Sequence, residues 1–151
     1  MKPQPWMLIL CIGVLWITTA AAKTDAAIDR KLTETRWQVY ATNALQTSPA
    51  LDFPYAECFT RAATAHDMPE TLLLAVARGE SDFKPRARSS ANAYGLMQIL
   101  WPGTAKHLGL ERLSDVLDPC TNVDAGARYL KELQQRYDGN LYRTLAAYNY
   151  G

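Results

Sequence analysis

Beyond residue 54, apolar side chains recur at the spacing of helix faces. Residues 55–66 keep their apolar positions near one side of a helix. Asp-Met-Pro-Glu at 67–70 has the form of a helix start, with a capping residue, a proline in the first turn and a glutamate three residues after the cap. Residues 72–77 contain no polar side chain, so we expect this helix to be buried on most sides and to end near Phe83.

The second half of the chain shows the same helical pattern after an irregular stretch. Residues 84–101 are the least regular part, and a short helix is expected over about 102–107. Asp118 and the proline after it start a longer helix, whose apolar stripe runs over 123–137. Asn140 caps a last helix. With no alternating strand pattern and no internal repeat, the chain is predicted to be mainly α, with a loop-rich middle.

The first 22 residues have the pattern of a signal peptide. Lys2 is followed by an apolar stretch over 6–17 and by three alanines at 20–22. Twelve apolar residues are short for a membrane span, so cleavage and a periplasmic location are expected. The alternative is an uncleaved anchor with membrane association. Cys11 follows a leucine inside the apolar stretch, so no lipoprotein is expected.

Residues 23–53 connect this segment to the main domain. Ile28, Leu32 and Val39 lie near helical spacing, with Trp37 between them. The segment is therefore either a short amphipathic helix, packed on the domain or on a partner, or a lead-in linker. Turn-forming residues follow it, so we place the main domain at 54–151.

Charge and composition exclude several classes of function. The 151 residues carry a net charge of +1, and removing 1–22 leaves 15 basic and 15 acidic residues. No run of Lys and Arg exceeds two, so neither nucleic acid nor an anionic membrane surface is an expected partner. His66 and His107 sit apart and lack ligand spacing with a carboxylate cluster, so no metal is expected. No Gly-rich phosphate loop is present, and no cofactor is expected.

Cys58 and Cys120 are the cysteines that remain after the signal segment. An even pair in an oxidising compartment favours a disulfide. Two buried free thiols are the alternative. Neither has a nearby histidine in the sequence, so no thiol nucleophile is expected.

Glu80 is the strongest candidate for catalysis. It lies in the last turn of the apolar helix, four residues after Val76 and three after Ala77, so a carboxyl group projects from an apolar stripe. Burial would raise its pKa, and a carboxyl group that stays protonated near neutral pH suits a general acid. The alternative is an ion pair with Arg86 or Arg88.

Asp82 is poorly placed as a second catalytic carboxylate. Two residues along a helix point to different sides, and Asp82 shares a face with Arg78, which favours a solvated ion pair. Glycosidases that use two carboxylates hold them at set separations across the bond. The residues therefore favour a mechanism that Glu80 runs alone.

Four motifs give the chain a family resemblance. Their sequences are Glu80-Ser81, Gly95-Leu96-Met97-Gln98, Ala147-Tyr148-Asn149, and Asp118-Pro119 with the helix over 122–130. In this order and spacing they resemble the soluble lytic transglycosylase family, over about residues 54–151. The resemblance implies a lysozyme-like, goose-type-like helical domain.

The resemblance also implies roles for individual residues. Glu80 would be the acid and then the base, Gln98 and Asn149 would hydrogen-bond the sugar chain, Tyr148 would orient Glu80 or the substrate, and Ser81 would line the site. Simpler alternatives stay open. Gln98 would satisfy loop backbone, and Tyr148 would be a core residue with a bonded hydroxyl group. Met97 is expected in the core, and Gly126 is expected to let helices approach closely.

Three features depart from the family pattern. Asn92 stands where the family often has glycine, and asparagine tolerates a left-handed backbone. Trp101 is an extra residue, either a platform for sugar stacking or a buried loop anchor. The chain stops at Gly151, just after the third motif, so it is either a minimal version or a fragment truncated at its C-terminus.

The implied reaction is cleavage of the MurNAc–GlcNAc bond of peptidoglycan with formation of a 1,6-anhydromuramoyl product. The rival hypotheses are a hydrolytic muramidase on the same fold and a non-catalytic glycan-binding component of an envelope machine. The expected partner is the peptidoglycan glycan strand, bound by a monomer. Small size and the positions of Cys58 and Cys120 also resemble the subset of the family that serves secretion-system assembly.

Overall fold

The computed structural model describes residues 27–43 and 52–150. The predicted signal segment at 1–22 lies outside these ranges. Within them, no helix combines the length and apolar character that crossing a membrane requires.

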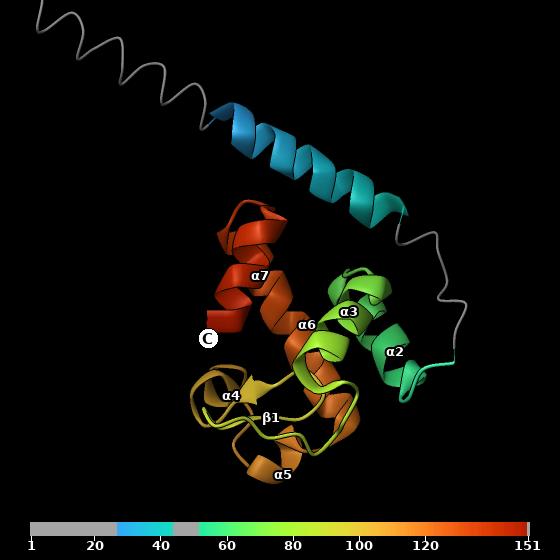
Figure 1. Ribbon diagram of the computed structural model, residues 1–151, viewed down its shortest axis with the longest axis vertical. Coiled ribbons are helices and arrows are strands. Elements are labelled where there is room, and N and C mark those ends of the chain that lie inside the picture. The colour runs from blue at the N-terminus through green and yellow to red at the C-terminus, as the bar shows by residue number, and fades with distance from the viewer. Residues whose placement is uncertain (1–26, 44–51, 151) are drawn as a thin grey trace, which may run out of the picture.

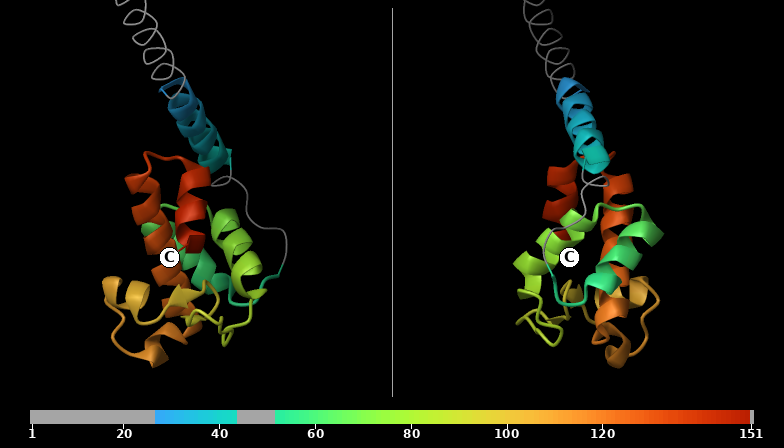
Figure 2. Two further views of the ribbon diagram at one scale, coloured as in Figure 1. Left: turned by 60° about the vertical axis from the view of Figure 1, so that its left-hand side comes forward. Right: turned by 90° about the vertical axis from the view of Figure 1, so that its right-hand side faces the viewer.

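The described chain is mainly helical and is arranged around one long central helix, α6 (Figure 1). α6 packs against α2 and α7, while a two-stranded hairpin and two short helices lie around its N-terminal end (Figures 1 and 2). The elements are a helix over 27–43, α2 (Ala56–His66), α3 (Glu70–Ser81), β1 (Ala93–Tyr94), β2 (Ile99–Leu100), α4 (Gly103–His107), α5 (Leu113–Val116), α6 (Pro119–Arg136) and α7 (Leu141–Tyr150).

The core forms where the apolar stripes of α2, α3 and α6 meet the loop before β2. Val123, Leu130 and Leu133 on α6 are fully or almost fully buried, as the stripe predicts. Phe59 of α2 and Leu73 of α3 are also fully buried. Burial of each such aliphatic or aromatic side chain away from water contributes about 1.5–3 kcal/mol to the stability of the fold.

The predicted disulfide between Cys58 and Cys120 is present, with a Cα–Cα distance of 4.8 Å. It links α2 to the first turn of α6 across 62 positions of sequence. A disulfide restricts the conformations of the unfolded chain. For a closed loop of this length, the bond would stabilise the fold by roughly 4 kcal/mol.

The sequence correctly predicted that α3 starts near residue 70, but the predicted capping residue is wrong. Asp67 does not cap α3, because its left-handed backbone ends α2 instead, where its N–H donates to Ala63 O. Pro69 precedes the first residue of α3, and no side chain caps that end. The Glu70 carboxylate turns toward α2 and accepts from Thr60 Oγ1 at 2.9 Å.

The hairpin and α5 add regular structure to parts predicted as irregular. β1 and β2 pair antiparallel, with Ala93 opposite Leu100 and Tyr94 opposite Ile99. Two-residue strands are too short to show alternation, and α5 spans a single turn. Asn92, just before β1, has a positive φ of 63°, so it takes the left-handed backbone expected of it.

Residues 27–43 form the helix alternative and not the linker. The predicted apolar face does not pack on the domain, and its contact with a partner stays a prediction. Ile28, Leu32 and Val39 are 58%, 52% and 55% exposed, whereas Trp37 on the opposite side is 6% exposed. Tyr40 Oη shares a hydrogen bond of 3.1 Å with Thr71 Oγ1 of α3. One large aromatic ring therefore sets the orientation of this helix.

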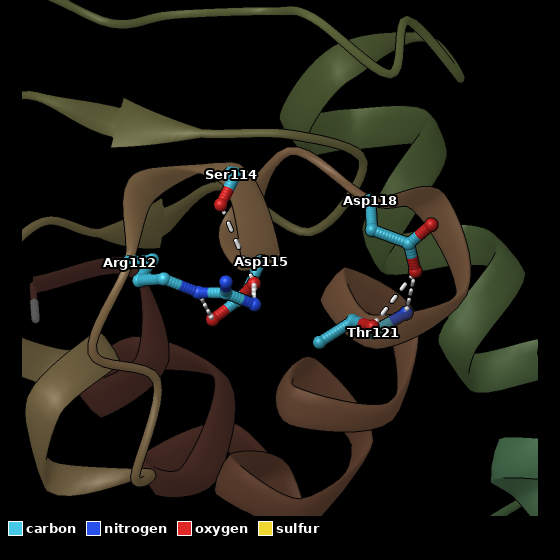
Figure 3. Close-up of polar contacts among 5 residues, drawn as sticks. All are labelled: Arg112, Ser114, Asp115, Asp118 and Thr121. Carbon is cyan, nitrogen blue, oxygen red and sulfur yellow. Dashed lines mark hydrogen bonds and ion pairs between the residues drawn. The ribbon is translucent and has the colours of Figure 1, made fainter.

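The N-terminal end of α6 is fixed by the predicted Asp118 cap, shown in Figure 3. One Asp118 carboxylate oxygen accepts from the Thr121 N–H at 2.9 Å and from its hydroxyl group at 2.7 Å. These hydrogen bonds lower the pKa of Asp118. Beside it, the Arg112 guanidinium hydrogen-bonds Asp115 and lowers the pKa of that carboxyl group (Figure 3).

Replacing the cap tests this view of α6. Asp118→Ala should lower the free energy of unfolding by about 1 kcal/mol near neutral pH. Because the pKa of Asp118 is depressed in the fold, the contribution of its charge is present above the unfolded value of about 3.9 and is lost as pH falls through the folded value. Urea unfolding at neutral and strongly acidic pH measures both.

Asp118→Asn is the matched control, because asparagine keeps the side-chain acceptor. It should stay within about 0.5 kcal/mol of the parent at neutral pH. An alanine variant as stable as the parent at neutral pH would contradict the role of the cap.

Candidate active site

Glu80 lies in the last turn of α3 and lines a cleft with a volume of about 300 Å³. Its carboxyl group is partly buried, and loss of water contact raises its pKa. Within the described residues it forms no ion pair. The alternative partner Arg88 instead donates to Asn92 Oδ1 at 2.7 Å. A lone carboxyl group with a raised pKa is chemically suited to giving and then taking back one proton.

Asp82 is turned away from this chemistry. Its carboxylate accepts from Arg78 Nε at 3.0 Å, four residues earlier on the same helix face. Lys84 Nζ is 3.8 Å from the other oxygen. The surface ion pair predicted for Asp82 is therefore confirmed.

Tyr148 of α7 brings its ring against the same cleft. The ring is 8% exposed, and its hydroxyl group donates to Met97 O at 2.7 Å. Burial, followed by the charges of Glu80 and Tyr129, raises the pKa of Tyr148. Tyr148 therefore meets the core-residue description, and it also lies close enough to Glu80 to influence it electrostatically. Because this hydroxyl group donates its hydrogen to Met97 O, it is not the donor of a hydrogen bond to Glu80 in this arrangement.

Gln98 also lines the cleft, and its backbone is left-handed, with a φ of 49°. Its side-chain Nε2 donates to Gly95 O at 3.0 Å and Ala87 O at 3.3 Å, so it satisfies loop backbone as the alternative held. Those bonds occupy the donor side of the amide and fix its position. Asn149, at the end of α7, lines the cleft from the other side and is exposed.

Asn122 fixes the loop that carries Gln98. It is fully buried on α6, where its Oδ1 accepts from the Met97 N–H at 2.7 Å. Its Nδ2 donates to Tyr94 O at 2.9 Å and Val116 O at 2.8 Å. One side chain thus satisfies three backbone groups that the irregular loop would otherwise leave unpaired.

Two glycines make this close packing possible. A Cβ at Gly95 would lie 2.3 Å from Asn122 Nδ2, and Gly95 also has a positive φ of 81°. A Cβ at Gly126 would lie 2.7 Å from Met97 Cβ. Gly126 thus lets the loop that carries Met97 pack closely against α6. We expected a neighbouring helix at this position, and the nearest neighbour is this loop instead. Met97 itself is fully buried, as expected.

Ser81 is not among the residues that line the cleft. Its side chain is 8% exposed, with Oγ 2.8 Å from Leu96 O and 3.1 Å from Ala77 O. The hydroxyl group can donate to one of these carbonyls at a time. This geometry gives Ser81 a role in holding α3 against the loop, and direct contact with a ligand stays a prediction.

The family described as the transglycosylase SLT domain matches residues 57–151. The chain belongs to this family. It is 36% identical over 104 residues to the soluble lytic murein transglycosylase of Escherichia coli K12, a match that covers 64% of this chain and 16% of the relative. The chain therefore spans about a sixth of that relative's length.

Solved structures of relatives agree with the SLT fold. The 70-kDa soluble lytic transglycosylase of Escherichia coli matches with a TM-score of 0.59 and 37% identity, over 64% of this chain and 17% of that one. An inactive glutamate-to-glutamine mutant of lytic transglycosylase Slt from Pseudomonas aeruginosa matches with a TM-score of 0.57 and 32% identity, over 63% and 16%. The lysozyme-like helical fold predicted from the motifs is thus confirmed.

Trp101 of this SLT domain is an anchor in the structure. It is partly buried and packs against the core, and it is not among the residues that line the cleft. The sugar-stacking alternative therefore has no support in the geometry.

The cleft is also lined by residues that the sequence interpretation missed, Thr104 and Tyr129 among them. The ring of Tyr129 packs against that of Tyr148 at an interplanar angle of 46°, with ring centroids 5.6 Å apart. Its place three positions after Gly126 puts it on the same face of α6, which was the available signal.

The two histidines each face one carboxylate, not a cluster. His66 Nε2 is 2.7 Å from Asp124 Oδ1, and His107 Nε2 is 2.7 Å from Glu132 Oε2. Within the described part of the SLT domain, no three residues of the metal-ligating types come together.

Removing the Asn122 amide should destabilise the whole domain. Asn122→Ala leaves three backbone groups without their partner, so we expect a loss of about 3 kcal/mol or more in the free energy of unfolding. Asn149→Ala, at an exposed asparagine, should change it by less than about 0.5 kcal/mol. Urea unfolding of both variants is the measurement. Equal stability of the two would show that Asn122 does not hold the loop.

Neutralising Glu80 should stabilise the fold at neutral pH. Because the pKa of Glu80 is raised in the fold, its charge costs stability as pH rises above the unfolded value of about 4.3, and this cost is absent below that value. With allowance for its partial exposure, Glu80→Gln should add about 0.5 kcal/mol, or roughly 1–2 °C in Tm, near pH 7. Thermal melts should show the gain fading toward about pH 4. A variant that melts below the parent at neutral pH would contradict this assignment.

Proposed function

We propose that this SLT domain is a peptidoglycan lytic transglycosylase that cleaves the β-1,4 bond between MurNAc and GlcNAc. The observation that carries the proposal is a single partly buried carboxyl group, Glu80, without an ion-pair partner among the described residues and facing a cleft. Membership of the family supports it, as does the inactive glutamate-to-glutamine mutant of the Pseudomonas relative.

The proposed reaction needs one proton and one carboxyl group. Protonated Glu80 donates its proton to the glycosidic oxygen as the C1–O bond of the muramyl residue breaks. The ring passes through an oxocarbenium-like state, which the new Glu80 carboxylate stabilises by its charge. The muramyl 6-hydroxyl group then attacks C1, and its proton passes to Glu80. The enzyme is regenerated, a 1,6-anhydro ring is formed, and no water is consumed.

The remaining motif residues would hold the sugar chain and the acid. Gln98 lines the cleft from the loop before β2, and Asn149 lines it from α7. Both offer amide groups that can hydrogen-bond sugar hydroxyl or acetamido groups. Tyr148 supplies an apolar wall beside Glu80 and helps to exclude water. Ser81 would support the site from behind through Leu96 O.

The setting of the reaction follows from the substrate. Peptidoglycan lies outside the cytoplasmic membrane, so the proposed activity requires export, and the segment at 1–22 has the pattern for it. We further propose that the domain acts in the periplasm. A monomeric state and service to a secretion-system assembly are also proposals.

The decisive experiment combines product analysis with one substitution. Incubation with purified peptidoglycan should give fragments that end in 1,6-anhydromuramic acid, lighter by one water than hydrolysis products in mass spectrometry. Glu80→Gln should lower the rate roughly a hundred- to ten-thousandfold, because the amide cannot donate the proton.

Asp82→Asn is the matched control, since Asp82 is two residues away and faces Arg78. It should keep most of the activity. Reducing ends in place of anhydro ends would identify a muramidase, and the absence of any product from folded protein would identify a binding component. Full activity of the Glu80→Gln variant would refute the assignment of the acid.

A further inference from the structure

The helix over 27–43 carries an apolar surface that the described part of the domain does not use. Figures 1 and 2 show this helix at the periphery of the domain, near the turn between α6 and α7. Trp37 packs one side of the helix on the core. On the opposite side, Ile28, Leu32 and Val39 leave more than half of their surface exposed. We call these three residues the aliphatic stripe.

The spacing of the stripe is that of a helix that packs against another helix. Positions 28, 32, 35 and 39 are four, three and four residues apart, as at the a and d positions of a coiled coil. Thr35 is the polar member of this series. Its Oγ1 donates to Lys31 O at 2.8 Å, so the hydroxyl group is already hydrogen-bonded and can be covered by an apolar neighbour at low cost.

Charged residues flank the stripe in a self-complementary order. Asp29 and Arg36 lie on one flank and Lys31 on the other. All three are exposed, and within 27–43 and 52–150 none of them forms an ion pair. Their charges are therefore available to a partner helix.

These charges favour one orientation for a second copy of the same helix. When two identical helices pack antiparallel, each flank meets the same flank of the other copy, so Asp29 of each copy lies near Arg36 of the other. A parallel pair would instead bring Lys31 of each copy near Arg36 of the other, with like charges together twice. Two attractive contacts thus replace two repulsive ones.

We propose that the 27–43 helix is a self-association surface on which a second copy of this chain packs antiparallel. Ile28 then lies opposite Val39 of the second copy, and Leu32 lies opposite its Thr35. A pair of helices of this length buries less than the roughly 1,200–2,000 Å² of a standard interface, so we expect a dissociation constant on the order of 0.1 mM.

The pairing is compatible with the proposed reaction and does not depend on it. No residue of the 27–43 helix lines the cleft, so each copy keeps its cleft complete. Because the association is weak, the monomer proposed above is the main species at the concentrations of an activity assay. Pairs form where copies are crowded together, and they join two complete SLT domains through one helix each.

Cysteine cross-linking tests the arrangement. In the exported chain Cys58 and Cys120 are already paired, so an added cysteine is the free thiol. The Ile28→Cys and Val39→Cys variants are oxidised alone and as a mixture, and covalent dimers are measured by non-reducing electrophoresis.

The mixture should form the dimer faster than either variant alone. In the antiparallel pair position 28 faces position 39, whereas two residues at position 28 lie about 16 Å apart along the helices, too far for a disulfide. Faster linkage of each variant to itself would indicate a parallel pair and overturn the proposal. So would equal rates in all three samples.

A charge exchange tests the flanking contacts. Asp29→Arg places like charges together at both contacts and should weaken self-association about three- to tenfold at low salt. Asp29→Arg/Arg36→Asp keeps the net charge of the parent and restores both attractive contacts, so it should associate as the parent does. Sedimentation velocity over a range of protein concentrations is the measurement. A double variant as weak as the single one would contradict the pairing of these residues.

A matched pair of variants tests the aliphatic stripe. Leu32→Asp places a charge in the proposed interface and should weaken association by more than about tenfold. Ala65→Asp adds the same charge at an exposed position of α2 and should associate like the parent. Both changed positions are exposed, so thermal melts should show both variants folded. A parent that stays monomeric up to about 1 mM would overturn the inference, as would an equal loss in the two variants.

Discussion

The buried carboxamide of Asn122 is the constraint on which the rest of the site depends. An irregular loop crosses the end of α6, and its backbone groups there are shielded from water. Asn122 satisfies the Met97 N–H and the carbonyls of Tyr94 and Val116 from a single position on the helix. In a poorly hydrated interior such hydrogen bonds are costly to lose, so the loop has one stable position.

The loop then transmits this position to the other two motifs. Ser81, next to Glu80, lies within hydrogen-bond distance of Leu96 O, and Tyr148 donates to Met97 O. The end of α3, the loop and the end of α7 are therefore tied through adjacent backbone carbonyls. Motifs that are far apart in sequence act as one unit because they share this short stretch of main chain.

The sequence predicted the long helices well, because their apolar stripes repeat over many residues. The cap at Asp118 and the position of Glu80 followed from the same local rules. Local rules failed where two signals competed. Asp67 looked like a cap for α3 but ends α2, and it is Trp37, not the stripe that starts at Ile28, that is buried on the domain. The hydrogen bonds of Asn122 depend on contacts between distant segments, which no spacing along the chain reveals.

The Cys58–Cys120 bond divides the domain topologically. It closes a ring that contains α3 with Glu80 and the loop with Gln98, while α7 with Tyr148 and Asn149 lies outside it. A protease that cuts the exposed turns near residues 84–92 would leave two pieces still joined, with the acid held in place by the same core. A cut between α6 and α7 would release α7 as a separate peptide. Cleavage of the backbone within the ring therefore keeps the two pieces covalently joined, whereas cleavage between α6 and α7 does not.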